Sequence, residues 1–396
     1  MEKIIGDAGA PHNANSKHLG EYIAASAILH TADGWGYLGR AIGAQCRGDV
    51  SVARHLAYYA ELRAALGLLS TQGIAIVSTR NAVLNTAGGI EFFPGGTHRM
   101  AWQALEHWSD QPSAAALLST IAQPGGVALA DWVSGLGIGT TGWNPLGREW
   151  LRAWGLDLRM FNRDRDARND ASYRPTALRQ APSTPNADAT FVQRFWPLFE
   201  PTAGEPFRHI DRHLLRLSLE RAFETVTGRQ SVGDPDFSKA LGRTLAANAG
   251  VDLGTTLGQF LGRALDPSTP ALFVAAGTRA SHLDSNFHAH VIARAALLLR
   301  VATGASNLLL SNAGIEPVQY RFWSEALAET HGVCDTGALP IDPADLWADV
   351  DDALQGLTAS VVAGWDRSFF TLLDTAASAI EVLSGCERVA IWGLAA

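Results

Sequence analysis

A charged cluster at Arg163–Arg174 is the first place where this sequence could hold an anion. Its twelve residues contain four Arg and three Asp, in a chain of which only 18% is charged. The planar guanidinium group matches the oxygen geometry of phosphates and carboxylates. The cluster therefore predicts either a site for an anion or, as the alternative, a solvated surface network of Arg and Asp.

Within this cluster, Arg168 is followed directly by Asn169 and, further on, by Tyr173. An Arg, a polar residue and then His or Tyr at this spacing resembles the Arg-x4–6-His motif of HEPN-superfamily ribonucleases. That family carries adjacent tyrosines on an upstream helix, and Tyr58 and Tyr59 occupy the corresponding place here. The resemblance covers about residues 50–180, and this chain has Tyr173 where the family has His.

The resemblance implies a metal-independent ribonuclease that works as a dimer, or a component of a toxin or antiphage system. Arg168 would then stabilise the charged phosphate in the transition state. Asn169 would orient that phosphate, and Tyr173 would move the proton. An ordinary phenol has a pKa near 10, so it is a poor proton acceptor at neutral pH.

A second pair, Arg208 and His213, forms a literal Arg-x4-His within a predicted helix at about 205–227. It is the second choice for the catalytic residues. His209 and His213 are also four residues apart, a spacing that puts both on one helix face. The alternative interpretation is a solvated or partner-facing stripe on a helix whose apolar side packs into the core.

The densest group of histidines suggests a weaker, metal-binding alternative. Imidazole and carboxylate groups are ligands for Zn²⁺ and Mn²⁺. The competing expectation is that Asp284 or Ser285 is the N-cap of a helix. The candidate ligands are His282, Asp284, His288 and His290.

The elements that must position these residues are predicted to be helices nearly throughout. A three-to-four spacing of apolar residues is typical of amphipathic helices, and Gly and Pro mark their ends. We predict a mainly α fold with two helical halves, 1–180 and 181–396, and at most a small hairpin at 74–84 in the first half. A break is expected at 31–34, and 272–275 and 389–392 are short strand candidates. The expected helices include 17–30, 35–47, 52–71, 98–108, 144–159, 205–227, 286–303, 317–331, 343–362 and 367–384.

The composition of the chain argues against some classes of function and some locations. The net charge of −8 and pI of about 5.8 argue against broad, sequence-independent nucleic-acid binding, but they leave room for a small basic pocket. The isolated cysteines and the lack of an apolar leader favour a cytoplasmic protein without a membrane span. We expect RNA as a partner, a homo-oligomer or protein partner, and no cofactor. The alternative function is a non-catalytic helical interaction or ligand-binding protein.

Overall fold

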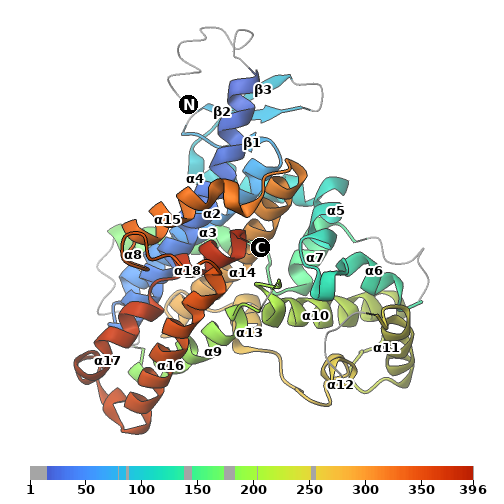
Figure 1. The fold of residues 1–396 in the computed structure, drawn as a ribbon. Coiled ribbons are helices and arrows are strands. Elements are labelled where there is room, and N and C mark those ends of the chain that lie inside the picture. Colours follow the sequence, from blue (N-terminus) through green and yellow to red (C-terminus); the bar gives the residue numbers. More distant parts are fainter. Residues whose placement is uncertain are drawn as a thin grey trace.

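The structure is a computed structural model that describes residues 16–78, 80–85, 89–137, 145–173, 183–202, 204–250 and 256–395. It is dominated by α-helices, which confirms the predicted fold class (Figure 1). The helices of the first half are α2 (Ser16–Cys46), α3 (Val50–Thr71), α4 (Thr97–Ser109), α5 (Pro112–Thr120), α6 (Leu129–Ser134), α7 (Gly147–Ala153) and α8 (Arg159–Tyr173). Those of the second half are α9 (Pro185–Phe195), α10 (Arg208–Thr227), α11 (Pro235–Ala247), α12 (Leu257–Leu261), α13 (Ala271–Gly277), α14 (Phe287–Asn312), α15 (Pro317–Thr330), α16 (Trp347–Val362), α17 (Phe369–Leu383) and α18 (Glu387–Leu394).

A small antiparallel sheet stands at one end of the molecule, beside the start of α2 (Figure 1). Its strands are β1 (Ile74–Ala75), β2 (Arg80–Leu84) and β3 (Ile90–Pro94), in that order. Ala82 pairs with Ala75 on one side and with Phe92 on the other. The first two strands match the predicted hairpin, and the third was not predicted.

Three long helices form the centre of the fold. α2 packs along α3, and α14 packs against both of them. Because α14 has neighbours on all sides, it is buried along most of its length, including two of its arginines, Arg294 and Arg300. A helix that is apolar all round is typical of such a core position.

The predicted break at 31–34 is wrong, because α2 continues through it. Thr31 bonds back to the carbonyl of Ala27, one turn earlier, and so stays within the helix. Gly34 faces α14, where a Cβ atom would come within 2.5 Å of the Leu299 side chain. The glycine therefore serves close helix packing, and tertiary contacts outweigh its low helix propensity.

Both short strand candidates are also wrong. Residues 272–275 lie in α13 and residues 389–392 lie in α18. Short apolar runs have no period of their own that separates a buried strand from a buried helix. Every residue of α18 is buried, so helical packing decided its conformation.

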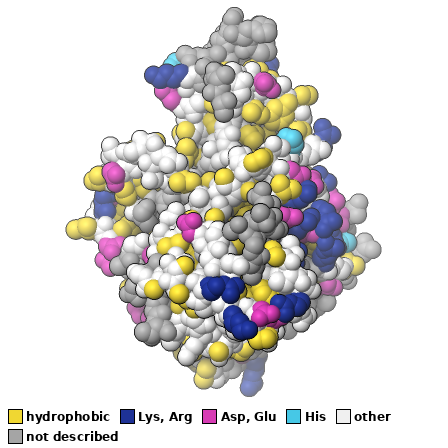
Figure 2. All heavy atoms as spheres, turned by 90° about the vertical axis from the view of Figure 1, so that its right-hand side faces the viewer, with side chains coloured by type: hydrophobic (Ala, Val, Ile, Leu, Met, Phe, Trp, Pro, Cys, Tyr) yellow, Lys and Arg dark blue, Asp and Glu magenta, His cyan; other side chains and the backbone are white. Residues whose placement is uncertain are grey.

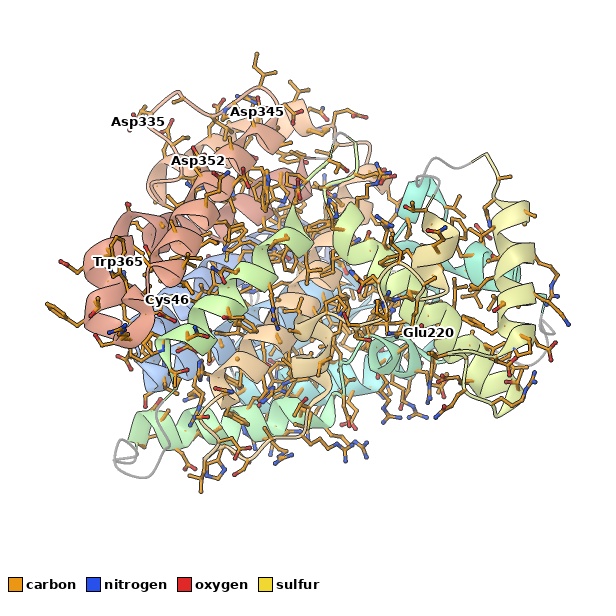
Figure 3. The ribbon with its side chains drawn as sticks, turned by 90° about the horizontal axis from the view of Figure 1, so that it is seen from below. Cys46, Glu220, Asp335, Asp345, Asp352 and Trp365 are labelled. Atoms are coloured by element: carbon orange, nitrogen blue, oxygen red, sulfur yellow. The ribbon has the colours of Figure 1, made fainter. Side chains whose placement is uncertain are left out.

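The proposed boundary near residue 180 lies outside the described residues. Around it, buried side chains from both halves of the chain form one continuous apolar cluster. Figure 3 shows Cys46, at the end of α2, on the side of α16 and Trp365, whereas Glu220 of α10 lies toward the opposite side. Helices of the second half thus pack on both parts of the first half: α14, α17 and α18 lie on α2, and α10 lies on α6 and α7.

Two segments are long and apolar enough to cross a membrane, namely α14 and Phe369–Leu394. In α14, 89% of the apolar window is buried inside the protein. A core helix of a globular protein has the same composition, so α14 carries little weight for a membrane location. The apolar window of Phe369–Leu394 is 33% buried, and this segment is divided between α17 and α18.

Candidate functional site

Residues 163–173 of the charged cluster lie in α8, and an ion pair in the protein interior fixes this helix to the core. Arg294 of α14 donates two hydrogen bonds, of 2.7 and 2.6 Å, to the carboxylate of Asp164. Glu61 of α3 lies 3.6 Å from the same guanidinium, and all three side chains are fully buried. Burial, together with the charge of Asp164, raises the pKa of Glu61 well above its ordinary value. The buried contacts of Arg294 with Asp164 and Glu61 therefore hold α8 against α3 and α14.

One turn after Asp164, Arg168 occupies a different environment. It is only 7% exposed, and its guanidinium lies over the rings of Tyr58 and Tyr59, at 5.2 and 5.5 Å from their centroids. Among the described residues, no carboxylate lies within ion-pairing distance of it, and its Nε is buried without a hydrogen-bond partner. A buried cation normally has a counter-charge, so Arg168 is the cation in this region best suited to an external anion.

His98 of α4 lies beside Arg168 and presents a lone pair to it. Arg168 donates from Nη2 to His98 Nε2 at 3.4 Å, because a guanidinium can only donate. The Nδ1–H of His98 must then donate to the Tyr58 hydroxyl, 3.0 Å away, which also accepts from the Trp102 indole at 3.3 Å. This fixes one tautomer of the neutral ring, in which the Nε2 lone pair is the acceptor of the Arg168 N–H.

The electrostatics of the site keep both of its histidines neutral. Burial, followed by the charges of Arg168 and Arg165, lowers the pKa of His98 below 6.5. Burial and Arg168 lower the pKa of His55 in the same way. His55 of α3 packs on the Tyr59 ring at 5.0 Å, and its Nδ1 lies 2.8 Å from the Ser172 hydroxyl. We call this group, made of His55, Tyr58, Tyr59, His98 and Arg168, the α8 site.

Burial also excludes the Tyr58 phenol as a proton acceptor at the α8 site. It raises the pKa of the Tyr58 phenol to about 12, and the indole of Trp102 opposes this shift only in part. Tyr58 therefore stays protonated at neutral pH and acts as an aromatic support and a hydrogen-bond partner.

The other two predicted residues of α8 lie outward from this group. Asn169 is half-buried next to Arg168, and Tyr173, at the end of the helix, is 78% exposed. Arg163 donates to the carbonyl of Ala280 at 3.2 Å and helps hold the loop before α14. Within the cluster, Asp164 and Arg163 therefore have structural contacts, Tyr173 lies at the surface, and Arg168 belongs to the candidate site.

The second predicted pair, Arg208 and His213, is divided between different surroundings. Arg208 begins α10, lies 3.7 Å from Glu205 and lines a cavity of about 710 Å³. In the same cavity wall, Arg300 donates hydrogen bonds of 2.8 and 2.6 Å to Asp211. The cations of this cavity have acidic partners, in contrast to Arg168.

His213 is directed into the core instead. It accepts a hydrogen bond of 3.1 Å from Arg216 and packs edge-on against Phe260, at a ring distance of 5.0 Å. Burial, followed by the charge of Arg216, lowers its pKa to about 3. A buried neutral imidazole in this position has a structural role.

The four residues proposed as metal ligands do not converge, because each contacts a different residue of the protein. His288 is fully buried and lies 3.0 Å from Asp188, whereas His290 bonds to the carbonyl of Ala275. His282 lies near Asp170, and Asp284 accepts from the backbone of Ser281. In the part of the chain that the structure describes, no three His, Cys, Asp or Glu side chains are grouped as a metal site.

Sequence reasoning missed both histidines of the α8 site. His55 could have been found, because it lies three and four residues before Tyr58 and Tyr59, on the same helix face. His98 follows the Pro94–Gly96 loop, and no spacing in the sequence relates it to Arg168. Only the packing of α4 and α8 against α3 brings it there.

The surface is charged unevenly. Figure 2 shows Lys and Arg side chains in a group at the right-hand edge of the face drawn, mixed with acidic residues and His, and in a second group in its lower middle. A net charge of −8 with local basic groups is compatible with a confined anion site.

Searches against protein-family models, curated proteins and solved structures find no match for this chain. Function must therefore be argued from the geometry of the site.

Proposed function

We propose that this protein is a metal-independent endoribonuclease whose active centre is the α8 site. The observation that carries the proposal is the buried guanidinium of Arg168, which has no carboxylate partner among the described residues and lies 3.4 Å from a neutral imidazole nitrogen. Cleavage of RNA through its own 2′-hydroxyl needs a cation for the phosphate and groups that accept and donate protons. The α8 site contains one such cation and two imidazoles.

The residues divide the chemistry between them as follows. When the N–H groups of Arg168 turn to the phosphate, the Nε2 lone pair of His98 becomes free and accepts the proton of the 2′-hydroxyl, whose oxygen attacks the adjacent phosphorus. Arg168 stabilises the negative charge that builds up on the phosphoryl oxygens. The bond from phosphorus to the 5′-oxygen breaks, and that oxygen takes a proton from His55. The products are a 2′,3′-cyclic phosphate and a 5′-hydroxyl.

His55 must be protonated for this last step, and we expect the bound substrate to promote its protonation. An anionic phosphodiester beside a histidine favours its charged form and raises its pKa. His98 takes the proton role that the sequence assigned to Tyr173, because it contacts Arg168 directly. Asn169 keeps its expected role in orienting the phosphate.

The decisive test compares two arginines in cleavage of single-stranded RNA in the presence of EDTA. We expect the wild-type protein to cleave RNA despite chelation, and Arg168→Ala to lower the rate roughly 100- to 1,000-fold, the effect of removing a transition-state donor. Arg208→Ala is the matched control and should retain the wild-type rate. Equal rates for Arg168→Ala and the wild type would overturn the proposal, provided that both variants melt near the wild-type temperature.

A second candidate function is non-catalytic binding of a protein partner or of another copy of the chain. Large apolar side chains are exposed on and near α15, where Val318, Phe322 and Ile341 are 76%, 72% and 95% exposed. Apolar residues of this size at a surface suit an interface. A Phe322→Ser substitution that changes the molecular mass in solution, in a protein that never cleaves RNA, would favour this function over the first.

A further inference from the structure

The cavity of about 710 Å³ at the start of α10 is a second place where the structure could hold a ligand. It lies between α10, the second half of α14 and the segment that follows α5. Its volume falls within the range of small-molecule sites, which is about 300–1,000 Å³. One face of α14 forms part of the wall, because the lining residues recur every three or four positions along this helix. They are Arg300, Gly304, Asn307, Leu308 and Ser311.

Arg300 is a buried cation in this wall, and the protein uses only part of its guanidinium. The side chain is 3% exposed, donates from Nε and Nη2 to Asp211, and lies over the Phe207 ring at 4.3 Å. Its third nitrogen, Nη1, donates no hydrogen bond within the described part of the chain. A Cβ atom at Gly304 would come within 2.6 Å of Nη1, so the glycine leaves room beside this nitrogen. Nη1 can therefore donate to an acceptor in the cavity.

A looser pair of opposite charges lies at the start of α10. Glu205 and Arg208 both line the cavity, and Oε2 of the carboxylate is 3.7 Å from Nε of the guanidinium. This distance is too long for a hydrogen bond, and the carboxylate accepts none from the described residues. The side chains of Glu205 and Arg208 are 27% and 32% exposed. Because Oε2 is buried, Oε1 is the carboxylate oxygen that a ligand can reach.

The charges of the cavity wall are balanced. Arg208 and Arg300 supply two cations, and Glu205 and Asp211 supply two carboxylates. A phosphate would lie beside the carboxylate of Glu205, which repels it, and a simple cation would lie beside the arginines. A ligand with one charge of each sign avoids both repulsions and can use the open groups of both signs.

We propose that this cavity binds a small zwitterion, with its ammonium on Glu205 and its carboxylate on Arg208 and on Nη1 of Arg300. Free amino acids and short peptides carry this pair of groups. The half-buried side chains of Pro206 and Leu308 add apolar surface on which the rest of such a ligand can pack. None of these residues belongs to the α8 site, so the proposal does not depend on RNA cleavage.

Blocking one end of the ligand at a time tests the two charge contacts. Isothermal titration calorimetry would compare leucine and dileucine with N-acetyl-dileucine, which lacks the ammonium, and with dileucine amide, which lacks the carboxylate. We expect the wild type to bind dileucine roughly 10- to 100-fold more tightly than either capped form, the effect of losing a hydrogen bond to a charged group. The comparison of leucine with dileucine shows whether an amino acid or a peptide is the better ligand.

Two variants assign the contacts to residues. Glu205→Gln should lose the preference for dileucine over its N-acetyl form and keep the preference over its amide. Arg208→Gln should keep the first preference and reduce the second. Arg221→Gln, a change at an exposed position of the same helix, is the control and should bind like the wild type. Glu205 and Arg208 are both partly exposed, so the variants should fold, and thermal melting checks this.

The outcomes are distinct from those of the RNA experiments. Binding with the expected preferences would support the zwitterion site whether or not the protein cleaves RNA. A wild type that binds neither leucine nor dileucine would overturn it. Equal affinities for the capped and uncapped forms would also overturn it, because the charge contacts would then contribute nothing. Binding that is unchanged in both variants would place the ligand elsewhere.

Discussion

The α8 site and the start of α10 differ in how each arginine is neutralised. Both regions carry an Arg, a polar residue and a His or Tyr further on. At the start of α10, Arg208 lies beside Glu205 and Arg300 is bonded to Asp211. On α8, the acidic residue one turn before Arg168 is already used by Arg294, and Arg168 contacts rings and an imidazole instead.

The histidines of the two regions, His98 and His213, also differ in burial and in their neighbours. His98 is half-buried with its Nε2 facing Arg168, whereas His213 is 8% exposed and enclosed by Phe260, Phe273 and Arg216. A base must be within reach of the proton that it takes, so accessibility matters as much as residue type. An Arg followed by a polar residue and then a His or Tyr can thus form either a candidate site or a contact in the core. The two cases differ in whether a carboxylate lies beside the Arg.

The largest expected difference between the regions is catalytic. His98→Asn keeps a short polar side chain beside Tyr58 but removes the base, so cleavage of RNA should fall by roughly 100- to 10,000-fold. His213→Asn, the matched change in α10, should leave the rate per folded molecule within about twofold. Measured single-turnover rates of RNA cleavage check both, and a larger loss for His213→Asn would reverse the assignment.

The next difference concerns stability. Arg294→Leu removes the partner of two buried carboxylates, Asp164 and Glu61, and should lower the free energy of unfolding by about 3–5 kcal/mol. Arg168→Leu leaves no carboxylate stranded and should cost clearly less. Urea unfolding followed by circular dichroism gives both values. Equal losses would mean that Arg168 has a structural counter-charge.

A smaller effect should appear on addition of an anion alone. Inorganic phosphate that occupies the α8 site stabilises the folded state, by about 2.7 kcal/mol at a concentration 100 times the dissociation constant. Thermal melts with and without phosphate should show this gain for the wild type and for Arg208→Ala. Arg168→Ala should lose it, and a gain that survives in Arg168→Ala would place the anion elsewhere.

The smallest effect per step of the measurement is the pH dependence that His213 adds to stability, because it builds up gradually over several pH units. Its pKa is about 3 in the folded protein against 6.5 when exposed, so the unfolded chain binds more protons between these values. The free energy of unfolding should therefore fall as the pH drops from 6.5 toward 3, by up to about 1.4 kcal/mol per pH unit from this group. His213→Asn should show a shallower slope in urea midpoints over that range, and an unchanged slope would contradict the neutral, buried state.

The sequence was informative wherever an element follows from local pattern. The spacing of apolar residues in α3 and α10 and the turns around β1 and β2 were enough to predict them. The continuous α2 was missed because the glycines that suggest a break are contact points for other helices. α8 was not predicted as a helix because it is rich in Arg and Asp and has few apolar residues, so no apolar spacing indicates its buried face.

The amino-acid sequence by itself determined that this protein is mainly helical, that its first half holds a short β-hairpin, and that Arg168 belongs to a cluster rich in Arg and Asp. The tertiary structure decided which arginines are neutralised, because Asp164 and Asp211 find their partners more than eighty residues away along the chain. It also brought His98 to Arg168 across 70 residues. Helical periodicity acts over a few residues, whereas the meeting of charges depends on how whole helices pack, and no local pattern encodes that.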